Sequence, residues 1–392
     1  MNSRLATVPR PAQLPAPPPQ AAAASSKLAR LIAGEVRRAG GWIPFARYME
    51  LALYAPGLGY YMAGARKLGR EGDFVTAPEI SRLYGRTLAR QVEQLARMGF
   101  SEILELGAGS GALAADLLTE LDRLGCPPER YLILELSPDL RDRSRDTLAK
   151  RAPHLLERVS WLNRLPPAFA GVVIGNEVLD AMPVRVFERA GRDILELGVT
   201  FRNGNFEWAP RSRQTPPDVP DPSCFPEDGY RTEIQFVARG FVKSVGESLA
   251  RGAAFYIDYG FPRHEYYHPE RSRGTLMCHY RHRAHDDPFF LPGLQDITSH
   301  LDFTAIAQAG RESGLDLLGY ASQAQFLVNC GITGILAETP ASDTTAYAPI
   351  AAQAQKLLSP AEMGELFKVI AFGKGVPAPL RGFTHGDKAH TL

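Results

Sequence analysis

Three closely spaced glycines give the clearest chemical signal in this 392-residue sequence. Gly107, Gly109 and Gly111 follow a short apolar run, and an amphipathic run comes after them. Glycines at this spacing let the backbone approach a ligand closely, because they adopt backbone angles that a Cβ atom would forbid. A strand, a glycine loop and a helix in this order are typical of nucleotide-type sites. A purely structural turn is the alternative.

Two acids beside the loop indicate which ligand it holds. Glu135 lies about two dozen residues beyond the loop, where an acid accepts hydrogen bonds from ribose hydroxyls. Glu105 lies directly before the loop and can meet the amino group of a methionine moiety. A nicotinamide enzyme brings a pyrophosphate to that point and should avoid a carboxylate there. Glu105 therefore favours S-adenosylmethionine over a nicotinamide dinucleotide.

A second polar cluster follows another apolar run, at 171–175. It comprises Asn176, Glu177 and Asp180, and a hydride-transfer enzyme has no evident use for it there. In the first turn of a predicted helix, Glu177 and Asp180 would share one face. The alternative is that the two acids only complement the positive end of that helix.

Alternating strands and helices must position these groups. Ligands of open α/β sheets bind beyond the carboxyl ends of the strands, where both acidic clusters fall. A β-rich insertion interrupts the pattern, with an Asn203-Gly204 hairpin turn. The sequence thus predicts an α/β fold with a mainly parallel sheet, whose strands are 103–106, 130–136, 159–162, 171–175, 253–258, 317–320 and 367–372.

The composition excludes several classes of protein. With 44 basic and 43 acidic residues the net charge is +1, which argues against nucleic acid as a partner. No apolar run approaches the roughly 20 residues of a membrane span. Four cysteines without a CxxC pair fit a reducing compartment. No feature of the sequence indicates an oligomeric state.

Histidines cluster between 264 and 285, but a metal site is not expected. Their spacing matches no zinc signature, and the interspersed arginines would repel a cation. The interpretation favoured instead is a solvated basic loop that contacts the substrate.

The Ala- and Pro-rich residues 1–26 contain two arginines and no acid. A targeting segment would also be amphipathic, whereas the prolines here break a helix. A disordered tail of a cytoplasmic, bacterial-type protein is favoured, with a mitochondrial-matrix protein as the alternative.

The sequence resembles the class I S-adenosylmethionine-dependent methyltransferases in Glu105, the glycine loop and Glu135. Longer segments resemble one family within them, the MidA-like family, which includes the mitochondrial complex I assembly factor that methylates an arginine. The glycine loop is common to many enzymes, whereas 72–81 and 176–184 are much more specific. The similar segments, which span most of 53–303, are 57–61, 72–81, the glycine loop, 176–184, 257–261 and 292–298 with His300, Asp302 and Phe303.

This resemblance implies S-adenosyl-L-methionine as cofactor and an arginine of a protein partner as acceptor. Carboxylates clamp a planar guanidinium through paired hydrogen bonds and can take up the released proton. Glu177 and Asp180 are therefore the predicted catalytic residues. The predicted cofactor-binding residues are Thr76, Pro78, Glu79, Glu105, Gly107, Gly109, Gly111, Glu135 and Asn176. The predicted substrate-binding residues are Asp258, His282 and His300.

Alternatives remain for several of these residues and for the activity. The segment 76–81 could simply begin a helix, with Pro78 in its first turn. Asp258 could be a strand-end turn residue, and His300 could be structural. The acceptor could be a small molecule or another side chain, or the chain could be a non-catalytic binding protein that keeps the fold.

The resemblance also implies a seven-stranded, Rossmann-like sheet whose last strand is antiparallel. We expect residues 27–98 to form a helical extension that covers the cofactor site. The methyltransferase domain would follow at 99–375, with the β-rich insertion at about 184–230. Residues 376–392 would be a polar tail.

Overall fold

The computed structural model describes residues 14–63, 75–212, 219–220, 224–377 and 379–392. The chain divides into two compact units. Unit 1 comprises Met1–Phe74, Ala181–Val237 and His264–His300, and unit 2 comprises Val75–Asp180, Ala238–Arg263 and Leu301–Leu392. The 98/99 boundary expected from the sequence is not where these units divide.

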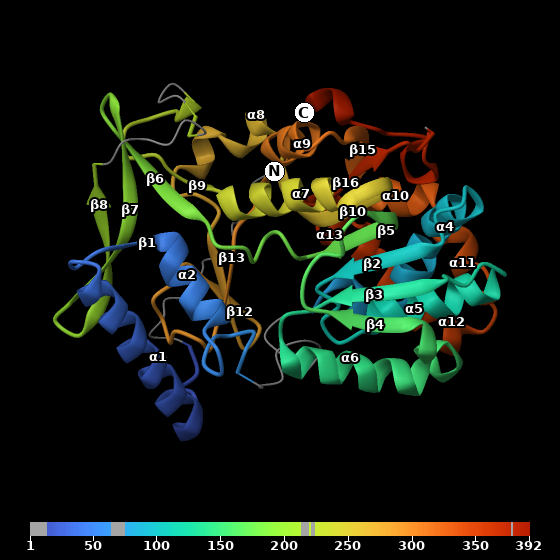
Figure 1. Cartoon of the computed structure of the whole chain (residues 1–392), viewed down its shortest axis with the longest axis horizontal. Coiled ribbons are helices and arrows are strands. Elements are labelled where there is room, and N and C mark those ends of the chain that lie inside the picture. Colours follow the sequence, from blue (N-terminus) through green and yellow to red (C-terminus); the bar gives the residue numbers. More distant parts are fainter. Residues whose placement is uncertain (1–13, 64–74, 213–218, 221–223, 378) are drawn as a thin grey trace. The chain divides into compact units, whose positions relative to one another are not determined.

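Unit 2 contains the predicted α/β sheet. Its strand order is β15-β16-β10-β5-β2-β3-β4 (Figure 1), and β14 pairs with β10. β2, β3, β4, β5 and β10 pair in parallel, and β16 is antiparallel to both β10 and β15. The strands are β2 (Glu102–Leu106), β3 (Arg130–Leu134), β4 (Val159–Leu162), β5 (Phe169–Asn176), β10 (Leu249–Phe261), β14 (Leu301–Asp302), β15 (Asp316–Ser322) and β16 (Phe367–Lys374).

The helices of unit 2 contribute buried apolar side chains to its core, and α5 does so beside the sheet. Leu113, Leu117 and Leu118, which the sequence places at helical spacing, are buried with Ile103 and Ile133 of the strands. The helices are α3 (Ala77–Ile80), α4 (Arg82–Arg97), α5 (Ala112–Arg123), α6 (Pro138–Arg151), α7 (Phe236–Ser248), α9 (Phe303–Glu312), α10 (Gln323–Asn329), α11 (Ile332–Leu336), α12 (Thr344–Leu358) and α13 (Met363–Leu366).

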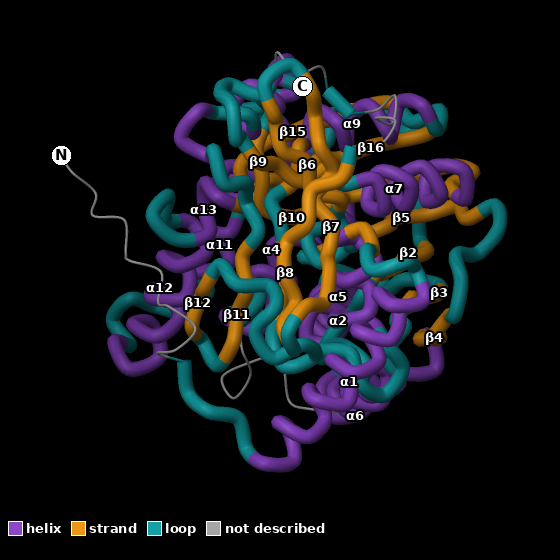
Figure 2. The backbone as a smooth tube through the Cα atoms, turned by 90° about the vertical axis from the view of Figure 1, so that its left-hand side faces the viewer, coloured by secondary structure: helices purple, strands orange, loops and turns teal. Residues whose placement is uncertain are grey.

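Unit 1 combines helices with two antiparallel sheets. One sheet has the order β1-β7-β6-β9 with β8 on β7, and the other has the order β12-β11-β13. Figure 2 labels β6 to β9 of the first sheet and β11 and β12 of the second. The predicted hairpins of the β-rich insertion are confirmed, and one turns at Asn203-Gly204. The elements are α1 (Pro19–Arg38), β1 (Ile43–Pro44), α2 (Phe45–Tyr54), β6 (Arg185–Ala190), β7 (Asp193–Arg202), β8 (Asn205–Arg211), β9 (Arg231–Ile234), α8 (Arg263–Tyr266), β11 (Met277–Tyr280), β12 (Arg283–His285) and β13 (Asp296–Thr298).

Both chain ends differ from the expected tails. Helix α1 begins at Pro19 rather than near residue 27, because proline is accepted at the first helical position and the alanines at 21–24 favour a helix. Residues 1–13 of the expected tail lie outside the described residues. Near the other end, Leu380 and Phe383 are buried, so their apolar side chains hold this mostly polar segment on unit 2.

The sequence pattern predicts a helix from about 232 to 250, and the start of this helix is wrong. Residues Arg231–Ile234 form β9 on the edge of the β6–β7 sheet, and α7 begins only at Phe236. Pairing with β6 outweighs the local helical pattern here. In the described parts of the chain, no helix is long and apolar enough to cross a membrane.

Candidate functional site

The glycine loop joins β2 to α5 as predicted. Gly107, Gly109 and Gly111 all have positive φ, at 65°, 53° and 80°. A Cβ atom on Gly111 would lie 2.8 Å from the Cα atom of Ser144. Both the backbone conformation and the close approach of α6 therefore require glycine at position 111.

Glu105 is buried at the end of β2, with only 2% of its surface exposed. The Tyr131 hydroxyl donates a 2.7 Å hydrogen bond to its carboxylate. Burial raises the pKa of Glu105 to about 7, assisted by the charge of Glu135 and opposed by the Tyr131 hydrogen bond. Near neutral pH both the protonated and the ionised form of Glu105 are therefore populated, and a neighbouring cation would favour the carboxylate.

Glu135 follows β3 and lies against the glycine loop. Its carboxylate accepts hydrogen bonds from the backbone of Ser137, at 2.9 Å, and of Gly109. Burial raises its pKa. The next residue, Leu136, is 65% exposed although it is apolar. Leu136 is not among the residues predicted from the sequence, although its apolar side chain directly after Glu135 is a signal that the sequence contains.

Helix α3 reaches the glycine loop from the preceding segment of unit 2. Thr76 is its N-cap residue, Pro78 lies in its first turn, and Glu79 accepts a hydrogen bond from the Ser110 hydroxyl of the loop. The segment therefore does begin a helix, as the alternative interpretation expected, and it also contacts the glycine loop. Residues 72–74 of the same motif lie outside the described residues.

The predicted helix at Glu177 and Asp180 is wrong. The chain instead turns after β5, and Glu177 has a φ of 52°, which is rare for a residue other than glycine. The Asp258 carboxylate accepts hydrogen bonds from the backbone N–H groups of Leu179 and Asp180, at 3.0 and 3.3 Å. These bonds satisfy the turn and replace the bonds that a helix would have made.

Glu177 is held by neighbours on both sides. Its Oε1 atom accepts hydrogen bonds from the backbone N–H of Ala77, at 3.2 Å, and from the amide of Asn176, at 3.1 Å. The Asn176 Oδ1 atom in turn accepts a hydrogen bond from the buried Tyr84 hydroxyl. Helix α3, helix α4 and the end of β5 therefore fix the Glu177 side chain together.

Three carboxylates meet where β5 ends beside β10. Ile257 of β10 is paired with Asn176, the last residue of β5, so Glu177 leaves the sheet beside Asp258, which is still within β10. Burial raises the pKa of Asp258 well above its usual range, and the charges of Asp180 and Glu177 raise it further. The Tyr259 hydroxyl donates a 2.5 Å hydrogen bond to Asp180. A cation placed here would relieve the repulsion among the acids.

His282 and His300 belong to unit 1, and not to the unit that carries the carboxylates. His282 lies in the turn between β11 and β12. The His300 backbone is held within its own unit, by Thr275 Oγ1 at 3.0 Å and Gln235 Nε2 at 2.8 Å. Their contact with substrate stays a prediction. Within the described ranges, no group of three or more His, Cys, Asp or Glu residues could hold a metal ion.

The sheet order, the glycine loop, the acids at the carboxyl ends of β2, β3 and β5, and Asp258 within β10 define a class I methyltransferase fold. A family model described as S-adenosyl-L-methionine-dependent methyltransferase matches residues 83–321. The chain belongs to this family, and its cofactor is S-adenosyl-L-methionine.

Relatives of known name are similar over most of the chain. The mitochondrial "Protein arginine methyltransferase NDUFAF7 homolog" of Drosophila melanogaster is 30% identical, over 94% of this chain and 92% of its own. The human protein arginine methyltransferase NDUFAF7 is 27% identical, over 84% of this chain and 80% of its own. A crystal structure from Burkholderia thailandensis, bound to S-adenosyl-homocysteine, is 53% identical with a TM-score of 0.95 and covers 97% of this chain and 100% of its own.

Proposed function

We propose that this methyltransferase methylates an arginine side chain of a protein partner. The observation that carries the proposal is the group of three carboxylates, Glu177, Asp180 and Asp258, where β5 ends beside β10. A guanidinium is the side chain that such a group would bind best, because it is cationic, planar and rich in donors. The names of the Drosophila and human relatives support the same acceptor.

The cofactor site we propose fits the local chemistry of unit 2. The buried Glu105 would pair with the amino group of the cofactor's methionine moiety, and Glu135 would accept hydrogen bonds from its ribose hydroxyls. Leu136, 65% exposed, offers an apolar face for the adenine. The remaining residues of the proposed site are Thr76, Pro78, Glu79, Gly107, Gly109, Gly111 and Asn176.

When bound, S-adenosylmethionine supplies an electrophilic methyl group on a sulfonium. Glu177 and Asp180 would hold the guanidinium so that one nitrogen faces that methyl group in line with sulfur. The new N–CH₃ bond forms as the S–CH₃ bond breaks, and the electron pair of that bond stays on sulfur. The nitrogen then releases one proton, which the carboxylates would accept and pass to water. Tyr259 and Asn176 would orient the two acids through their hydrogen bonds.

Other expected properties belong to this proposal. The partner would be a protein rather than nucleic acid, since the net charge is only +1. The protein would act in a bacterial-type cytoplasm, as its relative from Burkholderia thailandensis suggests. Asp258 would help to position Asp180, because its carboxylate accepts a hydrogen bond from the Asp180 backbone N–H.

Labelling with S-adenosylmethionine tests the acceptor. The full chain is incubated with methyl-labelled cofactor and a protein extract, and labelled peptides are fragmented to locate the methyl group. We expect the label on arginine nitrogen. A methyl group on another side chain, on nucleic acid or on a small molecule would contradict the proposal while leaving methyl transfer intact.

Substitution of the clamp tests the residues. Glu177→Gln and Asp180→Asn should each lower the rate of methyl transfer by at least about a hundredfold. Calorimetry should show the cofactor Kd changed by no more than a few fold, since neither carboxylate is assigned to the cofactor. Glu129→Gln, at an exposed position of unit 2, is the matched control. Full activity of Glu177→Gln with intact folding would indicate a non-catalytic role for the cluster.

A further inference from the structure

Unit 1 contains a pocket that the proposed methyl-transfer site does not use. Its volume is about 250 Å³. The residues that line it come from β8, from the start of β9 and the turn before it, from the segment between α8 and β11, and from the position after β12. They are Trp208, Gly229, Arg231, Ser272, Arg273, Leu276 and Asp286.

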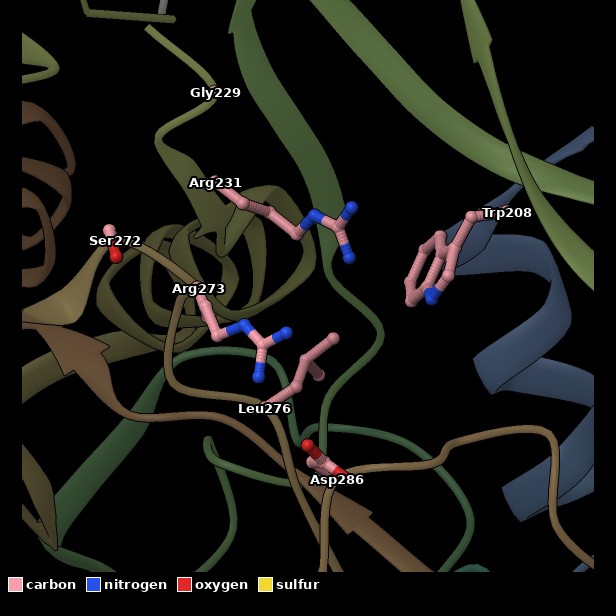
Figure 3. Close-up of a pocket in the computed structure, with 7 residues that line it drawn as sticks. All are labelled: Trp208, Gly229, Arg231, Ser272, Arg273, Leu276 and Asp286. Atoms are coloured by element: carbon pink, nitrogen blue, oxygen red, sulfur yellow. The ribbon is translucent and has the colours of Figure 1, made fainter. Parts of the chain in front are cut away.

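Two arginines give this pocket its character. Figure 3 shows the guanidinium groups of Arg231 and Arg273 pointing into the same opening, which faces Trp208. The backbones of the two arginines are joined by an isolated parallel bridge, which keeps the side chains adjacent. Two guanidinium groups at one opening are suited to an oxyanion, because each offers a rigid fork of N–H donors.

Arg231 is held in place before any ligand arrives. Its guanidinium pairs with Glu188 at 3.1 Å and lies 5.3 Å from the centre of the Trp208 ring. Arg273 is exposed, and it forms no ion pair within the described part of the chain. A fixed arginine beside a second one with free donors offers an anion a site at low ordering cost.

The size and lining of the pocket limit which ligands it can bind. About 250 Å³ is below the usual 300–1,000 Å³ of sites for whole cofactors or drug-sized ligands, so a single side chain fits better. Trp208 and Leu276 provide apolar walls for methylene groups. Asp286 lines the pocket beyond Leu276, away from Arg231 (Figure 3). There its carboxylate can accept a hydrogen bond from a backbone N–H of a bound peptide.

We infer that this pocket binds an acidic side chain of a polypeptide, aspartate or glutamate, through Arg231 and Arg273. The identity of the ligand rests on the proposed function, because a protein substrate would bring such a side chain to unit 1. The pocket would then select substrates in which an acidic residue accompanies the arginine that is methylated.

Nuclear magnetic resonance of the tryptophan indole groups tests this binding without methyl transfer. The chain has three tryptophans, and Trp208→Phe identifies the signal of Trp208. The probe is a capped pentapeptide with glutamate at its centre and glycine elsewhere, and the same peptide with glutamine is its control. We expect the glutamate peptide to shift the Trp208 signal in a saturable way, with the Trp42 and Trp161 signals unchanged.

Variants at the pocket decide whether the arginines bind the carboxylate. Arg273→Gln should weaken binding of the glutamate peptide at least about tenfold, because a charge-assisted hydrogen bond is lost. Asp286→Asn should strengthen it, because a like charge is removed while the amide oxygen can still accept the hydrogen bond from the peptide N–H. Arg192→Gln removes the same charge from an exposed turn of unit 1 and should change nothing. Melting temperatures of all variants confirm folding.

Three results would overturn the inference. They are equal affinity for the glutamate and glutamine peptides, unchanged binding by Arg273→Gln, and saturation of the Trp208 shift by inorganic phosphate at lower concentration than by the peptide. The last result would assign the pocket to phosphate. None of them touches the methylation assay, so failure here and failure of the proposed function can be told apart.

Discussion

Replacing Glu105 by glutamine should stabilise the protein in the absence of cofactor. The carboxyl group has a pKa of about 7 in the fold against an ordinary 4.5, chiefly because it is buried. The folded chain therefore binds more protons than the unfolded chain between these two values. The unfavourable contribution of Glu105 is nearly absent below pH 4.5 and reaches about 3 kcal/mol above pH 7.

Urea unfolding at two pH values measures this contribution. At pH 8, Glu105→Gln should raise the free energy of unfolding by up to about 3 kcal/mol, less what the amide loses when it is buried. The amide term does not titrate, so the gain should be about 2.5 kcal/mol smaller at pH 5 than at pH 8. Glu129→Gln, the same change at an exposed position, should give no such difference.

A pH-independent effect of Glu105→Gln would refute this reasoning. It would mean that the carboxyl group is not destabilised by burial, and that its position before the glycine loop needs another explanation. With saturating S-adenosylmethionine the sign should reverse, because the cofactor binds the wild-type protein much more tightly than it binds the variant. A binding residue is expected to behave in this way: its buried acid lowers the stability of the free protein, and ligand binding restores that stability.

Three further outcomes follow from the geometry of unit 2. Calorimetry should give a Kd for S-adenosylmethionine about tenfold weaker at pH 6 than at pH 8, because the ammonium group of the cofactor binds only the ionised form of Glu105, and Glu105→Gln should abolish this dependence. Gly111→Ala should lower the free energy of unfolding by at least about 2 kcal/mol and impair cofactor binding, because φ at this position is +80° and the new Cβ atom would lie 2.8 Å from the Cα atom of Ser144. Urea unfolding with an unchanged m-value tests this loss of stability. Tyr259→Phe removes the hydrogen bond to Asp180 and should lower kcat about tenfold with the cofactor Kd unchanged, whereas a change in Kd alone would move Tyr259 to the cofactor site.

The sequence by itself determined the parts of the site that depend on neighbouring residues. The apolar runs, the glycines of the loop and the positions of Glu105 and Glu135 identified the cofactor class, because backbone angles and strand periodicity are encoded over a few residues. Segments similar to a known family extended this to an expected acceptor. The same local logic failed at Glu177, where a helical pattern was expected and the chain turns instead.

Only the tertiary structure decided how the distant groups act on one another. Asp258 satisfies the turn at Leu179 and Asp180 because β5 and β10 are paired in one register, and nothing in either segment alone indicates this. The raised pKa of Glu105 depends on burial and on Tyr131 of the neighbouring strand. Likewise, Arg231, Arg273 and Trp208 are far apart in the sequence and line one pocket in unit 1. Burial and charge are properties of the packed chain, so a sequence pattern shows which groups are available and the fold decides which of them meet.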